Sequence, residues 1–143
     1  MYLTMDSKRR ISIPTKYRKG LGDSVVITRY FDGCLSIYSE KIWKSGKTKV
    51  QQLNKKFSIN RKHRRLSRFL TAGDQIDVDA SGRIVIPEHL AKFANLTEGV
   101  VFVGTEEGFQ LWSSTQWETE GMPSADEVQM LAESEEFQRL DDD

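Results

Sequence analysis

The residues of this sequence best suited to chemistry are an aspartate and an arginine that occur twice at one spacing. Asp6 stands four residues before Arg10, and Asp79 four residues before Arg83, each pair within the pattern Asp-x-x-x-Arg-Ile-x-Ile-Pro. An arginine can donate two hydrogen bonds to guanine O6 and N7 in the major groove of DNA. It can instead pair with its own aspartate and fix the local fold. Both interpretations stay open, although the basic residues directly before Arg10 favour DNA there.

Other kinds of chemistry find little support. The two aspartates could form a catalytic pair, but accepting backbone N–H bonds within their own turns explains them more simply. The sequence has no nucleophile elbow G-x-S-x-G and no phosphate loop G-x-x-x-x-G-K-[ST]. His63 and His89 lack acidic or cysteine neighbours at a metal-ligand spacing, and the single Cys34 is expected to pack as a small apolar side chain. The sequence therefore predicts no catalytic residue, no metal site and no cofactor, and a protein that is not an enzyme.

Strands on both sides of each loop must hold the aspartate and the arginine. Met5, Ile11 and Ile13 alternate with polar residues, as do their counterparts in the second motif, which is the period of half-buried strands. Each motif is therefore predicted to be strand, turn, strand, and a two-stranded ribbon fits the major groove. Gly82 can take a positive φ in the second turn, whereas Arg9 occupies its position in the first. The first loop is expected either to store strain or to form a different turn.

The repeat continues beyond the two motifs. Pro14 and Pro87 are expected to end a strand and open a short helix. An apolar run follows each helix, and then a second run that ends in an aromatic residue and precedes a tryptophan, at a spacing of 73 to 74 between copies. Two copies are too few for a solenoid. We therefore predict two half-folds that close on each other.

The remaining segments are expected to be helical. In the middle of the chain, apolar stripes predict two helices that are separated near residues 58–60. Near the end, Ser124 followed by Glu127 has the spacing of a capping box. The predicted fold class is α+β. The sequence divides into a first repeat (1–45), a helical connector (46–73), a second repeat (74–120) and an acidic C-terminal tail (121–143).

The charges are divided along the chain, although the formal net charge is zero. Residues 1–73 hold 18 Lys and Arg against 4 Asp and Glu, whereas residues 74–143 hold 3 against 17. The basic half suits a polyanion, and the acidic half can oppose it within one molecule or between neighbours. The chain shows neither a long apolar run nor a secretory signal at its start, so we expect a cytosolic protein with no membrane partner.

The two motifs, together with the segment Arg65-Leu66-Ser67-Arg68-Phe69-Leu70-Thr71-Ala72-Gly73 between them, resemble the MraZ family of bacterial transcriptional regulators. The resemblance implies two AbrB-like swapped-hairpin halves, a ring-like homo-oligomer, and binding to short direct repeats in the promoter of the division and cell wall gene cluster. Arg9 departs from the family pattern, which has Gly there, and the acidic tail is unusual. The DNA-contacting loop residues implied by motif position are Lys8, Arg9, Arg10, Ser81, Gly82 and Arg83.

The sequence therefore predicts a nucleoid-associated regulator that reads double-stranded promoter DNA through β-turn loops. Two alternatives stay open. One is an architectural protein that binds DNA without sequence preference. The other is a protein-interaction module, such as an AbrB-like antitoxin whose acidic tail engages a basic partner.

Overall fold

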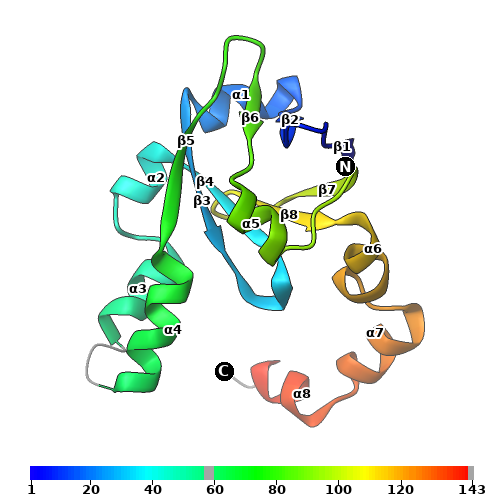
Figure 1. The fold of residues 1–143 in the computed structure, drawn as a ribbon. Helices are drawn as coiled ribbons and strands as arrows, with labels where there is room; N and C mark the ends of the chain where they lie inside the picture. Colours follow the sequence, from blue (N-terminus) through cyan, green and yellow to red (C-terminus); the bar gives the residue numbers. More distant parts are fainter. Residues whose placement is uncertain (57–59, 142–143) are drawn as a thin grey trace.

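The two repeats share one antiparallel sheet. The computed structural model describes residues 1–56 and 60–141 (Figure 1). The strands are β1 (Tyr2–Thr4), β2 (Arg10–Ser12), β3 (Ser24–Arg29), β4 (Leu35–Ser39), β5 (Gly73–Asp77), β6 (Arg83–Val85), β7 (Gly99–Gly104) and β8 (Phe109–Ser113). Six of them form the main sheet in the order β1-β7-β8-β4-β3-β5, and β2 and β6 form a separate two-stranded ribbon.

The strand pairing exchanges elements between the repeats. The first strand of each motif joins the other repeat's part of the sheet, because β1 pairs with β7 and β5 pairs with β3. The second strands, β2 and β6, pair with each other around Ile11 and Ile84. This arrangement confirms the α+β class with two half-folds packed together. Each motif is strand, turn and strand, as predicted, but its two strands do not pair with each other, because the ribbon takes one strand from each motif.

The ribbon closes the core from one side of the sheet. Ile11, Ile13, Ile84 and Ile86 are each at most 1% exposed, whereas Ser12 between the first pair is exposed. These isoleucines pack against side chains of one sheet face, including those of β3 and β7. The two helices that follow the ribbon strands contribute further side chains to the same core. The alternation in each motif therefore has the predicted cause, which is burial of one face of a strand.

The helices start and stop at residues with suitable backbone preferences. Pro14 and Pro87 precede the helices α1 and α5 as cap residues, one position earlier than the first helical position expected for them. Gly22 ends α1 with a φ of 74°, and Asn95 follows α5 with a φ of 54°. The helices are α1 (Thr15–Leu21), α2 (Glu40–Lys44), α3 (Lys49–Lys56), α4 (Arg61–Thr71), α5 (Glu88–Phe93), α6 (Ser114–Gln116), α7 (Ala125–Ala132) and α8 (Glu135–Asp141).

The connector packs on the other face of the sheet. Val50 of α3 and Leu70 of α4 are buried against Tyr38 of β4, which confirms the predicted apolar stripes. Asn60 caps α4 by accepting the backbone N–H of Lys62 at 2.8 Å. The predicted break between the helices falls on residues 57–59, which lie outside the described part of the chain.

The chain ends in an arm that projects from the sheet (Figure 1). We call residues 122–141 the C-terminal arm; it holds α7 and α8. Ser124 caps α7 by accepting the backbone N–H of Glu127 at 3.2 Å, as its spacing predicted. Asp142 and Asp143 of the predicted tail lie outside the described residues. Across the described ranges, none of the helices is long and apolar enough to span a membrane.

Candidate nucleic-acid interface

Each motif forms a loop that is closed by its aspartate. We call residues 6–10 loop 1 and residues 79–83 loop 2. In loop 1, Asp6 Oδ1 accepts the backbone N–H groups of Lys8 and Arg10, each at 2.9 Å. In loop 2, Asp79 Oδ1 accepts those of Ser81 and Arg83, at 2.9 and 2.8 Å. The two aspartates therefore act as turn-forming residues, as predicted.

These hydrogen bonds favour the ionised form of both carboxyl groups. The backbone N–H of Arg10 lowers the pKa of Asp6 below its ordinary value, and the backbone N–H of Arg83 does the same to the pKa of Asp79. The ion pairs with the two arginine side chains act in the same direction. Both loops are therefore closed by a charged aspartate at neutral pH.

Each arginine pairs with its aspartate and still reaches the surface. Arg10 Nε donates to Asp6 Oδ2 at 2.7 Å, and Arg83 Nε donates to Asp79 Oδ2 at 2.9 Å. The two arginine side chains are 35% and 39% exposed. Because this bond uses Nε, the guanidinium has two further nitrogen atoms for donation. Pairing with aspartate and contacting a base therefore do not exclude each other.

Both loops have the same backbone conformation, although one has Arg where the other has Gly. The φ angle is 60° at Arg9 and 79° at Gly82. The N–H of Arg9 donates to Asp6 O at 3.0 Å, and the N–H of Gly82 donates to Asp79 O at 2.9 Å. Of the two outcomes expected for loop 1, the structure has the strained turn. A left-handed φ costs about 1 kcal/mol for a residue with a Cβ.

The side chain of Arg9 compensates for this cost by bonding to the other repeat. Its Nε donates to Ile86 O at 2.8 Å. The equivalent carbonyl of the first repeat, Ile13 O, accepts from Arg18 Nε of α1, also at 2.8 Å. Ala91 of α5 occupies the position equivalent to Arg18 and has no side-chain donor. Arg9 therefore supplies from the loop the bond that Arg18 supplies from the helix.

Arg18 was not predicted from the sequence. Its side chain covers Gly82, so that a Cβ added there would collide with it, and Gly82 is buried. No motif marks Arg18, because its counterpart in the repeat is Ala91. Only the structure identifies it, through its bond to Ile13 O, which matches the bond of Arg9 to Ile86 O, and through its position over Gly82 of the other repeat.

The six predicted interface residues fall into two surfaces. In the antiparallel ribbon, Arg9 O accepts from Ile86 N at 2.9 Å, and Gly82 O accepts from Ile13 N at 2.8 Å. Loops 1 and 2 therefore lie at opposite ends of the ribbon, and loop 2 forms the top of Figure 1. Lys8 and Ser81 are exposed at the tips of the loops, Arg9, Arg10 and Arg83 are half-buried, and Gly82 is buried.

The other candidate groups are structural. Cys34 is 1% exposed, and burial raises the pKa of its thiol to about 12, which suits the predicted apolar packing. His89 Nε2 lies 3.3 Å from Asp74 Oδ2, a contact that the sequence did not predict. In the part of the chain that the structure covers, no three acidic, histidine or cysteine residues are grouped to hold a metal ion.

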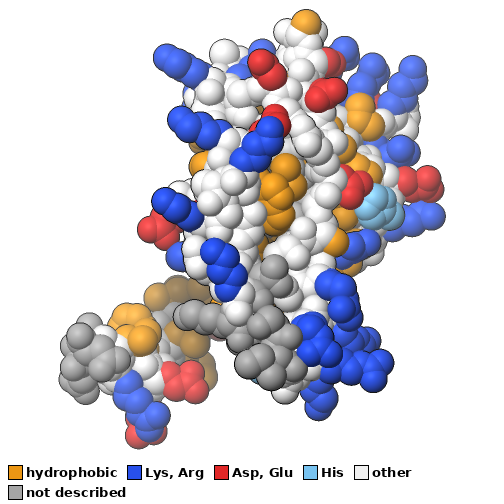
Figure 2. Space-filling view, turned by 90° about the vertical axis from the view of Figure 1, so that its left-hand side faces the viewer, with side chains coloured by type: hydrophobic (Ala, Val, Ile, Leu, Met, Phe, Trp, Pro, Cys, Tyr) orange, Lys and Arg blue, Asp and Glu red, His pale blue; other side chains and the backbone are white. Residues whose placement is uncertain are grey.

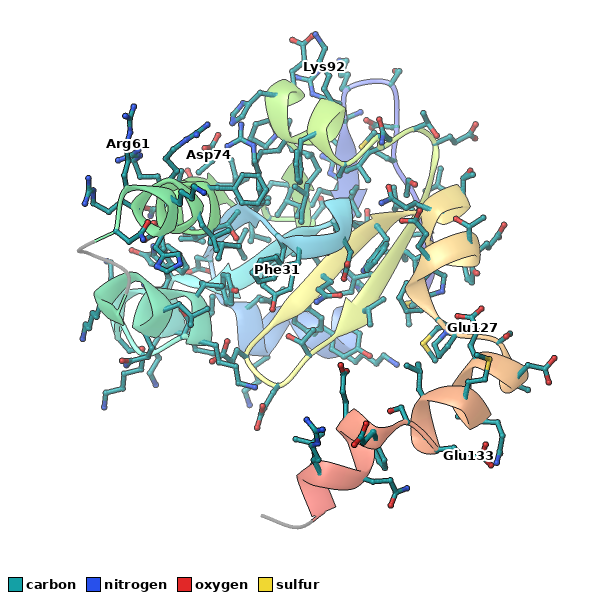
Figure 3. All side chains as sticks on the ribbon, turned by 90° about the horizontal axis from the view of Figure 1, so that it is seen from below. Phe31, Arg61, Asp74, Lys92, Glu127 and Glu133 are labelled. Carbon is teal, nitrogen blue, oxygen red and sulfur yellow. The ribbon has the colours of Figure 1, made fainter. Side chains whose placement is uncertain are left out.

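The two charge classes gather on different elements. Figure 2 shows Lys and Arg side chains clustered over α4, which has no acidic residue. Figure 3 places Arg61 of α4 on one side of the molecule and Glu127 and Glu133 of the C-terminal arm on another. The exposed cations of α4 are Arg61, Lys62, Arg64, Arg65 and Arg68.

Comparison with known proteins adds a family and a set of relatives. A family model described as "MraZ protein, putative antitoxin-like" matches residues 2–68 and again residues 69–140. The chain is similar to "Transcriptional regulator MraZ" of Lachnoclostridium phytofermentans, with 38% identity over 87% of this chain and 86% of the relative. It is 34% identical to the protein of the same name in Natranaerobius thermophilus, over 91% of this chain and 90% of the relative. It is 36% identical to the "Transcriptional regulator MraZ" of Clostridium tetani, over 80% of this chain and 79% of the relative.

Proposed function

The chain belongs to the MraZ family, and we propose that it regulates transcription by binding short direct repeats in the promoter of the division and cell wall gene cluster. The relatives bear the name of transcriptional regulators, and the protein is not an enzyme. The single observation that carries the proposal is the pair of aspartate-closed loops, each of which presents an arginine at the surface.

In each loop, one residue contacts a base and another contacts the DNA backbone. Arg10 and Arg83 are held by their aspartates with part of each guanidinium exposed, which suits bidentate donation to guanine. Lys8 and Ser81 stand at the loop tips, where they meet phosphates and sugars. Arg9 and Gly82 contribute through the shape of the turn. A pre-formed loop loses little conformational entropy when it binds.

Several direct repeats in one promoter can be bound at once by several identical subunits, and we propose a ring-like homo-oligomer. Within one subunit, the basic α4 and the acidic C-terminal arm lie apart (Figures 1 and 3). Charge complementarity therefore favours contact between the basic half of one subunit and the acidic half of the next. Such a head-to-tail contact closes into a ring when the rotation between subunits permits.

One observation favours a second candidate function, which is a protein-interaction module. The family description contains the word antitoxin-like, and the C-terminal arm exposes apolar side chains among its acidic ones. An acidic, apolar arm suits a basic protein partner. The exposed apolar residues of the arm are Met122, Val128, Met130, Leu131, Phe137 and Leu140.

Competition binding at two salt concentrations separates these functions. A promoter duplex with its repeats and a scrambled duplex are titrated with the protein in the presence of competitor DNA. A sequence-reading regulator keeps its preference for the repeats, whereas an architectural protein binds both duplexes and loses affinity steeply with salt. Binding of neither duplex would contradict the proposal and leave the interaction module. A footprint over the DNA upstream of the protein's own gene then locates the operator. We propose that the protein acts there as a cytoplasmic regulator associated with the nucleoid.

A further inference from the structure

Loop 2 has fewer cations of its own than loop 1. The residues between its aspartate and arginine are Ala80, Ser81 and Gly82, whereas loop 1 has Lys8 and Arg9 among the same three positions. Phosphate contact supplies most of the affinity of DNA-binding proteins and depends on Lys and Arg. If loop 2 contacts DNA, cations for phosphate contact have to come from elsewhere in the fold, because Arg83 is its only cation.

Helix α1 of the first repeat places two cations beside loop 2. Arg18 lies over Gly82, and its Nε is fixed by Ile13 O. Lys19, the next residue, is exposed. A groove of about 350 Å³ separates the helix from the loop and is lined by both side chains together with Asp79 and Ala80. The fold therefore joins a loop from the acidic half to cations from the basic half.

The equivalent groove beside loop 1 differs in its charges. Lys92 of α5 occupies the position of Lys19, but it pairs with Glu88 at 3.3 Å. In α1 the position of Glu88 is taken by Thr15, so the helix has no acidic residue in its first turn. The groove at loop 1 instead lies beside a loop that carries its own cations. The cations beside loop 1 therefore come from the loop itself, whereas those beside loop 2 come from the neighbouring helix.

We infer that the groove formed by Arg18, Lys19 and loop 2 binds a phosphate of the DNA backbone. The inference rests on the proposed function and adds a contact across repeats that completes loop 2. Two carboxylates also border the groove, Asp23 and Asp79, of which Asp79 is paired with Arg83. Arg83 does not line the groove, but its ion pair neutralises Asp79, so Arg18 and Lys19 face one uncompensated carboxylate, that of Asp23. This excess of one positive charge suits one singly charged phosphodiester, whereas a free phosphate dianion or a nucleotide polyphosphate would leave negative charge uncompensated there.

The test compares Lys19→Gln with Lys55→Gln, which removes the same charge from the exposed surface of α3. Affinities for the promoter duplex and the scrambled duplex are measured by fluorescence anisotropy over a series of salt concentrations. Lys19→Gln should weaken both complexes alike and lower the slope of log affinity against log salt by about 1 per bound subunit. Lys55→Gln should leave the slope unchanged, and Lys19→Arg should keep the wild-type slope.

Three results would overturn the inference: an unchanged slope in Lys19→Gln, an equal loss in Lys55→Gln, or a loss that light scattering traces to a changed oligomer. Inorganic phosphate is titrated at constant ionic strength as a competitor. Displacement of DNA at millimolar phosphate from wild type but not from Lys19→Gln would assign the groove to a free anion instead. The proposed function fails separately, when the wild type does not prefer promoter repeats. Even then, a Lys19-dependent slope on scrambled DNA supports the groove.

Discussion

At the scale of single residues, Arg9 and Arg18 make one contact from two different positions. Each donates its Nε to the carbonyl of an equivalent isoleucine, one from a loop and the other from a helix. The same contact in both halves is the physical reason why an arginine is tolerated where the second repeat has Gly82. A sequence comparison of the repeats pairs Arg9 with Gly82 and Arg18 with Ala91, so it hides the equivalence.

This equivalence predicts a compensating double substitution. Arg9→Gly should change the free energy of unfolding little, because losing a hydrogen bond worth about 1 kcal/mol is offset by relief of a similar φ strain. Ala91→Arg alone should destabilise, because Arg9 already fills the space. Together, Arg9→Gly and Ala91→Arg should make the protein at least as stable as the wild type. Denaturant unfolding of the four proteins measures this order, and additive effects would contradict it.

A second prediction concerns the base-reading arginine of loop 1. Arg10→Ala should lower the binding free energy that separates the promoter duplex from the scrambled duplex by roughly 1 to 3 kcal/mol per bound subunit, because one bidentate contact is lost. The melting temperature should fall only slightly, since the Asp6–Arg10 pair lies at the surface, where solvent screens it. Circular dichroism and anisotropy measure the two effects. Wild-type preference in a folded Arg10→Ala protein would exclude loop 1 as the reader.

At the scale of elements, the loops depend on charged aspartates. Asp6 and Asp79 have pKa values below the ordinary value because their carboxylates accept backbone N–H bonds. The unfolded chain therefore binds more protons in this pH range, and stability rises with pH. The stabilisation is complete above the ordinary aspartate pKa of about 3.9 and is lost as the pH falls through the lowered values.

Replacing both aspartates should remove this pH dependence. Asp6→Asn with Asp79→Asn should be less stable than the wild type at neutral pH, and the difference should shrink as the pH falls below the ordinary aspartate pKa. Denaturant unfolding at several pH values measures it. Asp77→Asn with Asp126→Asn, which removes the same two charges at exposed positions outside the loops, is the control for a general effect of charge. A constant difference across pH would mean that the loops do not need the charge.

The alternation of apolar residues predicted the strands of both motifs, but not their partners. Period two decides which face of a strand is buried, and it is equally satisfied by a hairpin or by an exchange between repeats. The exchange is favoured by packing of Ile11, Ile13, Ile84 and Ile86 into one core, which no local pattern encodes. The aspartate-closed turns were predictable because their chemistry is local. Arg18 was not, because its contact with loop 2 is made to Gly82, which is distant in sequence.

At the scale of the whole molecule, the negative charge of the C-terminal arm offsets part of the positive charge of the first half of the chain. Figure 3 shows Glu127 and Glu133 on the C-terminal arm, apart from the sheet. In the proposed oligomer, an arm near the loops of a neighbouring subunit would compete with DNA phosphates. Because base contacts do not depend on this competition, non-specific binding is affected most.

Deleting residues 133–143 should therefore tighten binding to scrambled DNA more than binding to the promoter duplex. The effect should be largest at low salt, where competition between carboxylates and phosphates is least screened. Anisotropy titrations of the full-length and truncated proteins with both duplexes measure it. Equal affinities for scrambled DNA at low salt would leave the arm without a part in DNA binding.

The shared ribbon also has a consequence for symmetry. Each repeat carries one ribbon strand and one outer strand, and both are paired with strands of the other repeat. A protein built from one repeat alone would therefore need a second copy of itself to pair these strands, with the ribbon on the two-fold axis, and its two loops would be identical. In this chain one polypeptide contains both repeats, so the two loops can differ, as they do at Arg9 and Gly82.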